Sequence, residues 1–218
     1  GVPLYFARRT DLLQKPLVAL IRAAYDIVTG GWDAEDVSAY LRTGLAGLTP
    51  EETDTLENYV LLWSLRGGAW TRPEPWRQHP DGYGAPDTDE AAARLAEIND
   101  LRRRAADPLQ LLGAESHTAA TAEAQAMALA DFLERLQLAQ RLDTLAGDLR
   151  REGRGALAAE YAQLWELTVG ALEQFAAILG GTQMDADTFA TLFLRMLSCY
   201  DIGTIPVALD RVTAGDLD

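Results

Sequence analysis

The sequence predicts an all-α fold, and three observations support this prediction. Apolar residues recur every three or four positions over most of the chain, which is the spacing of one helix face. Long stretches are rich in Ala and Leu, which have high helix propensity. Only residues 2–6 and 205–213 have the pattern of extended segments. We therefore expect about seven or eight helices, with short extended segments at both termini.

Two helices are predicted before residue 45. The first covers residues 12–28, where apolar residues follow helix spacing and Pro16 is early enough to fit a first turn. Two glycines at 30–31 end this helix. Asp33 is a suitable N-cap for the second helix, which stops at Thr43-Gly44.

The third predicted helix has a strong start signal. Thr49 can cap it, Pro50 suits its first position, and Glu52 completes a capping box. Two glycines at 67–68 break the helix. Asn58 lies in its middle and has low helix propensity, so we expect its side chain to hydrogen-bond to the preceding Thr-Gly turn.

An irregular stretch divides the chain. Residues 71–87 are rich in Pro and Gly, which excludes a regular helix, and a connection of this length is either functional or flexible. We therefore predict four regions. They are a first helical subdomain over 1–70, an irregular connection over 71–87, a long-helix subdomain over 88–200 and an extended segment over 201–218.

Four helices are predicted in the second half, over residues 89–106, 118–149 and 156–179, and from Asp185 or Asp187 to Leu197. The arginines at 102–104 fall in the last turns of the first of these, where cations suit the helix dipole. Pro108 marks a kink or a new start after it. Two interpretations are open for these arginines and for those at 150–154. They are solvated helix ends, which is the preferred interpretation, or they contact DNA or an acidic partner.

The bulk composition limits the possible functions. The formal net charge is −14, from 19 basic and 33 acidic residues, which argues against a DNA-coating surface but allows a local basic patch. Cys199 is the only cysteine, so no disulfide forms within the chain, and we interpret it as a small buried hydrophobe. The sequence shows neither a signal segment nor an apolar run that spans a bilayer, so we expect a cytoplasmic protein without membrane contact.

Motifs that carry chemistry are tested and rejected. Lys15 is the only lysine and precedes Pro16, so no Walker A loop is present and we expect no ATP hydrolysis. His79 and His117 lack partners at metal-ligand spacing and are interpreted as exposed polar residues. The carboxylates are interpreted as solvated faces and helix caps rather than as a catalytic pair. We therefore expect no catalytic residue, metal or cofactor here.

The leading candidate site is a DNA-binding patch made of Arg42, Thr43, Gly44, Arg66, Gly68, Trp70 and Arg72. In the functional interpretation, glycine N–H groups and the Thr hydroxyl approach a phosphate, the arginines supply charge, and the Trp ring stacks on a base. In the structural interpretation, the glycines are helix C-caps and Trp70 seals the core. The structural interpretation is preferred for Trp70, and both remain open for Arg42 and Arg66.

The same region carries a family resemblance. Residues 41–45 (LRTGL), 56–60 (LENYV) and 66–70 (RGGAW), followed by Trp76, resemble the B subunit of the AddAB (RexAB) helicase–nuclease. In that family the position of Arg42 is commonly Lys, so the charge is retained. This departure slightly favours a phosphate contact.

The ends of the chain extend this resemblance. Residues 202–218 are similar to the segment where the family's chain returns to its helicase core, and residues 2–6 to the segment where it leaves. The sequence also starts without Met, so we expect a piece of a larger protein. The resemblance implies a helical domain inserted into the second RecA-like core, the counterpart of the 2B domain of superfamily 1 helicases. Its two ends are then expected to lie side by side.

The resemblance implies a non-catalytic part of a helicase–exonuclease subunit that processes double-strand DNA breaks for recombinational repair. It implies the A subunit and a double-stranded DNA end or fork as partners, with ATP, Mg²⁺ and an iron–sulfur cluster only in the parent protein. We expect the segment to buttress the DNA channel and to contact DNA or the partner subunit. The alternatives are a protein–protein interaction scaffold without DNA contact and a stand-alone ligand-binding domain. A basic strip favours DNA contact, whereas arginines dispersed over unrelated faces favour the scaffold.

Overall fold

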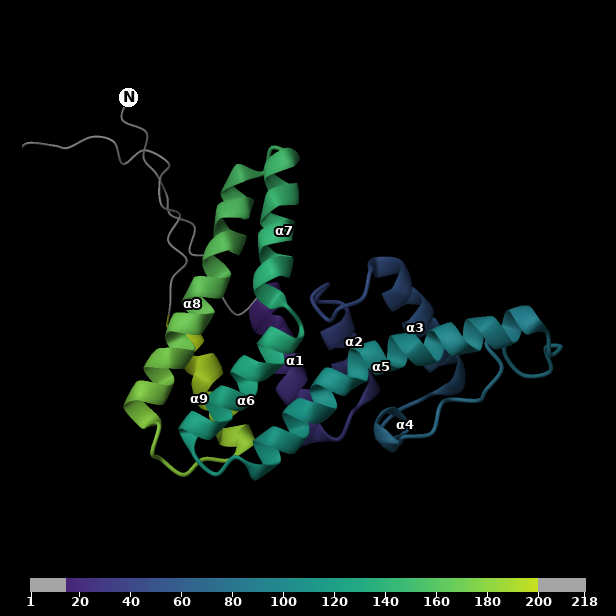
Figure 1. Cartoon of the computed structure of the whole chain (residues 1–218), viewed down its shortest axis with the longest axis horizontal. Coiled ribbons are helices and arrows are strands. Elements are labelled where there is room, and N and C mark those ends of the chain that lie inside the picture. Colours follow the sequence, from purple (N-terminus) through teal and green to yellow (C-terminus); the bar gives the residue numbers. More distant parts are fainter. Residues whose placement is uncertain (1–14, 200–218) are drawn as a thin grey trace, which may run out of the picture.

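The computed structural model describes residues 15–199, and within this range the chain is helical and forms no strand. The helices are α1 (Pro16–Gly30), α2 (Ala34–Leu41), α3 (Pro50–Trp63), α4 (Gly68–Thr71), α5 (Asp89–Thr118), α6 (Ala122–Arg135), α7 (Leu138–Arg151), α8 (Gly155–Leu179) and α9 (Ala186–Ser198) (Figure 1). The all-α prediction is confirmed. The extended segments predicted at 2–6 and 205–213, and their expected pairing, lie outside the described residues.

The helix starts follow the sequence signals. Pro16 stands in the first turn of α1. At α3, Thr49 and Glu52 each accept a hydrogen bond from the other's backbone N–H, so the predicted capping box is confirmed. Asp185, one of the two predicted caps, accepts from a backbone N–H in the first turn of α9. Asp33 occupies the N-cap position of α2 without a side-chain capping bond.

Helix α5 continues past a proline. It passes through Pro108, where the sequence predicts a kink or a new start, so the predicted end before it is wrong. Leu101, Ala105 and Leu109 are buried along one stripe that crosses this position. Burial of the stripe offsets the lost hydrogen bond and the ring clash, which cost about 3 kcal/mol in a helix interior. The arginines at 102–104 therefore lie in the middle of α5 rather than in its last turns.

The single helix predicted over residues 118–149 is two helices, α6 and α7. The chain turns at Gln137, whose backbone is left-handed with a φ of 53°. Arg141 holds this corner because its Nε donates to the carbonyl of Leu136 at 2.7 Å. Neither Gly nor Pro marks the turn in the sequence. The short helix α4 was also missed, because its four residues are too few to show a periodic pattern.

The irregular connection is tied to the helices on either side of it. Tyr59 and Trp63 of α3 donate to backbone carbonyls of the connection at 2.8 and 3.1 Å. Asn99 of α5 accepts from the N–H of Trp76 at 2.7 Å and donates to its carbonyl at 3.0 Å. The two ring nitrogens of His79 each contact a backbone atom of the connection at 3.1 Å. These bonds fix the connection between α3 and α5.

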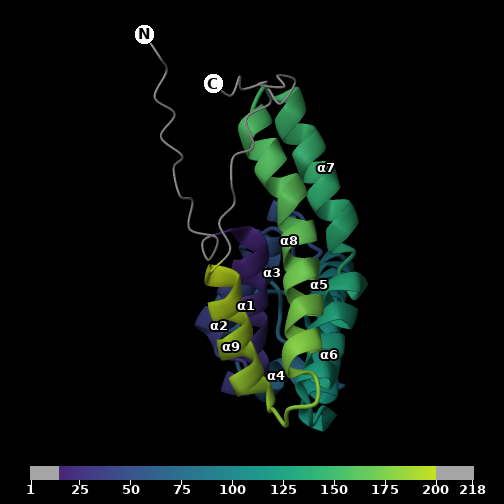
Figure 2. The same ribbon diagram turned by 90° about the vertical axis from the view of Figure 1, so that its left-hand side faces the viewer.

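Buried residues from α1 to α9 and from the joining loops form one main core cluster. Helix α1 packs against α2, α5 and α9, and α8 packs against α6, α7 and α9. Figure 2 shows α1, α9 and α8 side by side. The core therefore crosses the boundary between the two predicted helical subdomains, and the division into these subdomains stays a prediction.

Helix α7 and the first half of α8 project from the rest as an antiparallel hairpin (Figures 1 and 2). A small separate cluster of Ala146, Leu149 and Ala158 holds the two helices together there. Lys15, at the start of α1, forms an ion pair with Glu160 on α8 and so links the hairpin to the body.

Candidate functional site

The first half of the predicted patch is a tight turn after α2. The Thr43 hydroxyl donates to the carbonyl of Tyr40 at 2.7 Å and accepts from the N–H of Leu45 at 3.2 Å. Gly44 has a φ of +71°, a conformation that favours glycine. Thr43 and Gly44 therefore shape the turn, and the Thr43 hydroxyl is already engaged.

Arg42, beside this turn, is paired within the chain. Its Nε and Nη2 lie 3.0 and 3.1 Å from the carboxylate oxygens of Glu57 on α3. The Ser38 hydroxyl donates to the same carboxylate. Glu57 thus ties α3 to α2, whereas Asn58 is exposed, so the bond predicted for Asn58 is wrong. Because the Arg42 side chain is 68% exposed, its ion pair stabilises the fold only weakly.

A buried tryptophan holds the second half of the patch. Trp70 on α4 is 1% exposed, stacks on Trp32 with ring centroids 6.3 Å apart and meets Trp76 edge-on at 5.1 Å. The Gly67 N–H donates to the carbonyl of Trp32 at 3.0 Å, just before Gly68 starts α4. Trp70 therefore seals the core, as the structural interpretation predicts, and has no free face on which a base could stack.

Three exposed arginines, Arg66, Arg72 and Arg77, lie along the chain on either side of α4 and in the connection after it, and we call them the arginine segment. Among the described residues, none of the three has an acidic partner. Arg72, Arg77 and the buried Trp76 help to line an open pocket of about 510 Å³. Sequence reasoning missed Arg77, because no periodicity orders side chains in the irregular connection.

Behind the arginine segment, Arg102 of α5 is buried and holds its backbone. Its Nη1 donates to the carbonyl of Glu74 at 2.8 Å, and its Nη2 to that of Trp70 at 3.0 Å. It also donates to the carbonyl of Arg72, and its guanidinium lies 5.0 Å from the centroid of the Trp76 ring. Burial, and then the charge of Arg72, lower the pKa of Arg102. The interpretation of Arg102 as a solvated helix end is therefore wrong.

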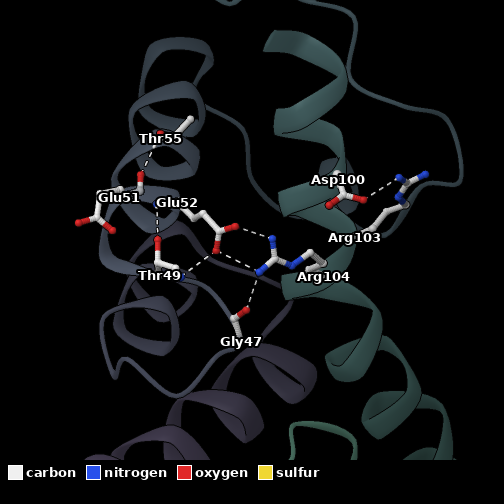
Figure 3. Close-up of polar contacts among 8 residues, drawn as sticks. All are labelled: Gly47, Thr49, Glu51, Glu52, Thr55, Asp100, Arg103 and Arg104. Carbon is white, nitrogen blue, oxygen red and sulfur yellow. Dashed lines mark hydrogen bonds and ion pairs between the residues drawn. The ribbon is translucent and has the colours of Figure 1, made fainter. Parts of the chain in front are cut away.

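Arg104 of α5 joins the capping box of α3 (Figure 3). Its Nη1 and Nη2 lie 2.6 and 3.0 Å from the carboxylate oxygens of Glu52, and Nη2 also donates to the carbonyl of Gly47 at 2.8 Å. The same carboxylate accepts from the N–H of Thr49 at 2.8 Å. The bond from Arg104, and then the bond from Thr49, lower the pKa of Glu52.

Glu52→Gln is expected to lower the free energy of unfolding by about 0.5–1 kcal/mol at neutral pH, because the ion pair is lost while Gln still closes the capping box. The folded-state pKa of Glu52 lies below its ordinary value of 4.5. Its stabilisation is therefore present above that pH and is lost as the pH falls through the folded-state pKa. Urea unfolding from about pH 7 to about pH 3 should show the difference between wild type and variant shrink. Glu51→Gln is the control in the same turn, and an equal, equally pH-dependent loss there would contradict this account.

The remaining arginines are dispersed over the molecule. Arg103 pairs with Asp100 on its own helix at 3.0 Å. The arginines at 150–154 lie at the turn between α7 and α8, the far end of the projecting hairpin (Figure 1). Two of them pair with acidic neighbours in the same turn. These residues therefore do not join the arginine segment in one basic strip.

Other predictions about chemistry concern metals, the cysteine and the membrane. Within residues 15–199, no group of three or more His, Cys, Asp or Glu side chains is arranged to hold a metal ion. Cys199 is exposed, so its interpretation as a buried hydrophobe is wrong, because it stands at the C-cap of α9 beyond the last buried turn. No helix of this range combines the length and apolar character that a membrane span needs.

Known proteins are similar to this chain over its whole length, although no family model matches it. The chain is 31% identical over 218 residues to the B subunit of the ATP-dependent helicase/deoxyribonuclease of Clostridium botulinum (strain Loch Maree / Type A3). It is 31% identical over 219 residues to the same subunit of Acetivibrio thermocellus and 32% identical over 228 residues to that of Desulforudis audaxviator.

These similarities cover 100% of this chain but only 19%, 19% and 20% of the three relatives. The chain thus spans about one fifth of the length of the curated relatives it matches. Along its whole length, the chain therefore corresponds to a segment of the B subunit of ATP-dependent helicase/deoxyribonucleases, the family that its motifs resemble.

Proposed function

We propose that this chain is a non-catalytic helical module of the B subunit of a helicase–deoxyribonuclease, inserted into the second helicase core of that subunit. In this proposal it buttresses the path of DNA while double-strand breaks are processed for recombinational repair, next to the A subunit. The similarity over the whole chain to proteins of that name supports the proposal. The ATP–Mg²⁺ site, the iron–sulfur cluster and the nuclease residues then belong to other parts of the parent protein.

The arginine segment is the DNA contact in this proposal. Arg66, Arg72 and Arg77 are exposed and form no ion pair among the described residues, although Glu74 lines the same pocket as Arg72 and Arg77. Arg102 fixes the backbone under Arg72, so the guanidinium groups extend from an ordered stretch. Burial, and then the charge of Arg72, lower the pKa of Arg102, whereas Asp107 and Glu74 act in the opposite direction. Three exposed arginines in one ordered stretch suit phosphate, which forked guanidinium groups bind well.

The rest of the predicted patch has a supporting role in this proposal. Arg42 is already paired with Glu57, the Thr43 hydroxyl is engaged in its own turn, and Trp70 is buried. Gly44 shapes the turn after α2, and Gly68 starts the short helix between Arg66 and Arg72. We therefore expect these residues to position the backbone without touching DNA.

A protein-interaction scaffold without DNA contact is the second candidate, and the dispersal of the arginines favours it. Arg42 and Arg104 are paired with glutamates, and Arg102 is buried. Only the arginine segment offers several exposed arginines without an ion pair in one stretch of the described chain.

Fluorescence anisotropy of a labelled duplex with a single-stranded tail, titrated with the chain, separates the two candidates. We expect binding at about 50 mM salt and weaker binding at about 200 mM, because phosphate contacts release counterions. Replacing the three residues of the arginine segment by Ala should weaken binding at least about tenfold and reduce the salt slope by about 2–3.

The control is a triple variant with the same change of net charge, Arg151→Ala/Arg154→Ala/Arg195→Ala, which removes exposed arginines at the end of the projecting hairpin and on α9. It should keep the wild-type affinity within about twofold, because exposed charges beyond a Debye length are screened. Equal losses in both triple variants would mean that only net charge matters. An absence of binding at the lower salt concentration would support the scaffold.

A further inference from the structure

An apolar groove lies on a different part of the molecule from the arginine segment. It has a volume of about 850 Å³ and is bordered by α6, the start of α7 and α8. Helices α6 and α8 pack against each other, and Figure 1 shows them away from α4. Met127 on its α6 side is 62% exposed, and Trp165 and Val169 on its α8 side are only partly buried. The groove therefore leaves apolar side chains of two helices uncovered.

The lining on α8 has the period and length of a helix-binding surface. Trp165, Val169, Leu172 and Ala176 follow one another at helix spacing along one side of α8. They span about three helical turns, or roughly 16 Å at 1.5 Å per residue. A ligand that lies in an apolar groove must satisfy its own backbone hydrogen bonds, which a helix does and an extended peptide does not.

The rim of the groove is acidic. Glu123, Glu134 and Glu173 are exposed along it. Arg135 lines the groove as well, but its Nη1 lies 2.8 Å from a carboxylate oxygen of Glu115, and its Nη2 contacts the other oxygen. Three carboxylates therefore face one cation that is already neutralised. This charge pattern excludes nucleic acid and favours a basic ligand.

We propose that this groove binds an amphipathic α-helix of a partner protein, with an apolar face of about three turns and Lys or Arg residues along its flanks. A second copy of this chain fits less well, because its net charge of −14 opposes the acidic rim. The site is independent of the proposed DNA contact, since it shares no residue with the arginine segment.

Three labelled synthetic peptides of about 18 residues, long enough to form helix, test the proposal by fluorescence anisotropy with the full chain. One has Leu at helix spacing and Lys on its flanks, one has the same Leu face with Glu, and one has the basic composition in scrambled order. The basic amphipathic peptide should bind at least about tenfold more tightly than either of the others. Glu134→Lys/Glu173→Lys should reverse the preference toward the acidic peptide.

Met127→Glu should weaken binding of the basic amphipathic peptide at least about tenfold, because it places a charge on the exposed apolar wall. Leu111→Glu is the matched control, since Leu111 is 48% exposed on α5 outside the groove. Equal binding of the scrambled peptide, or equal losses in the two variants, would overturn the proposal. Self-association of the chain that Met127→Glu abolishes, without peptide binding, would identify a second copy as the occupant. The triple Ala variant of the arginine segment should bind the peptide like wild type.

Discussion

Replacing Arg102 by methionine is expected to lower the free energy of unfolding by about 3 kcal/mol. Methionine retains much of the side-chain length but none of the donors that reach the carbonyls of Trp70, Arg72 and Glu74. A buried acceptor without a partner costs roughly 1–3 kcal/mol. Arg102 is also buried, with only 5% of its surface exposed, so it differs from an arginine on the protein surface. The expected loss is therefore larger than that of an exposed ion pair.

Urea unfolding followed by circular dichroism measures this loss. Arg102→Lys should lose about 2 kcal/mol, because one ammonium cannot reproduce the guanidinium fork. Arg103→Met, which changes the charge equally at an exposed neighbour, should stay within about 0.5 kcal/mol of wild type. Faster amide hydrogen exchange over residues 70–77 in Arg102→Met would show that Arg102 holds this backbone. If Arg102→Met and wild type unfold with the same urea midpoint, that role is refuted.

Local signals in the sequence predicted the helix starts. The capping box of Thr49 and Glu52, the early position of Pro16 and the cap of Asp185 all involve contacts within one turn. The residues that make such a contact lie within a few positions of one another, so the local sequence is enough to predict it.

The predictions that failed depend on contacts between distant segments. Pro108 stays inside α5 because buried residues continue on both sides of it, and the turn at Gln137 depends on how α6 and α7 pack. Arg102 did have a usable signal, since it lies one helical turn after Ile98 and beside Leu101 on the buried side of α5. An arginine that falls on the apolar stripe of a helix is expected to be buried. Here the exposed Arg103 and Arg104 that follow Arg102 made it look like part of a charged surface.

The candidate site was predictable only in part for the same reason. The burial of Trp70 follows from its large apolar ring and the exposure of Arg66 and Arg72 from their charge, and neither depends on recognising α4. The pairing of Arg42 with Glu57 could not be read from the sequence, because it depends on the packing of α3 against the end of α2. The apolar groove joins residues of α6 and α8, so it exists only after those helices pack.

Phe189→Ala is expected to lower the free energy of unfolding by about 4 kcal/mol, through lost burial and the cavity that remains. Phe189 of α9 is fully buried, and its ring lies 5.1 Å from Phe175, 5.6 Å from Phe193 and 5.8 Å from Tyr25. These partners belong to α8, α9 and α1, so the ring joins three helices. Leu192→Ala, on the exposed side of α9, should cost less than about 1 kcal/mol. A loss below about 1 kcal/mol for Phe189→Ala would contradict this account.

The two large variants together test whether the predicted subdomains unfold separately. Phe189 contacts α1, and α1 packs against α5, which carries Arg102, so a continuous core connects the two sites. If this core unfolds as one unit, Arg102→Met and Phe189→Ala each shift a single urea transition that keeps its slope. If the chain divides at residues 71–87, unfolding is biphasic, and both variants shift only the phase of the 88–200 subdomain, to which Arg102 and Phe189 belong. A single transition is expected, because α1 lies before the division while its packing partners α5 and α9 lie after it.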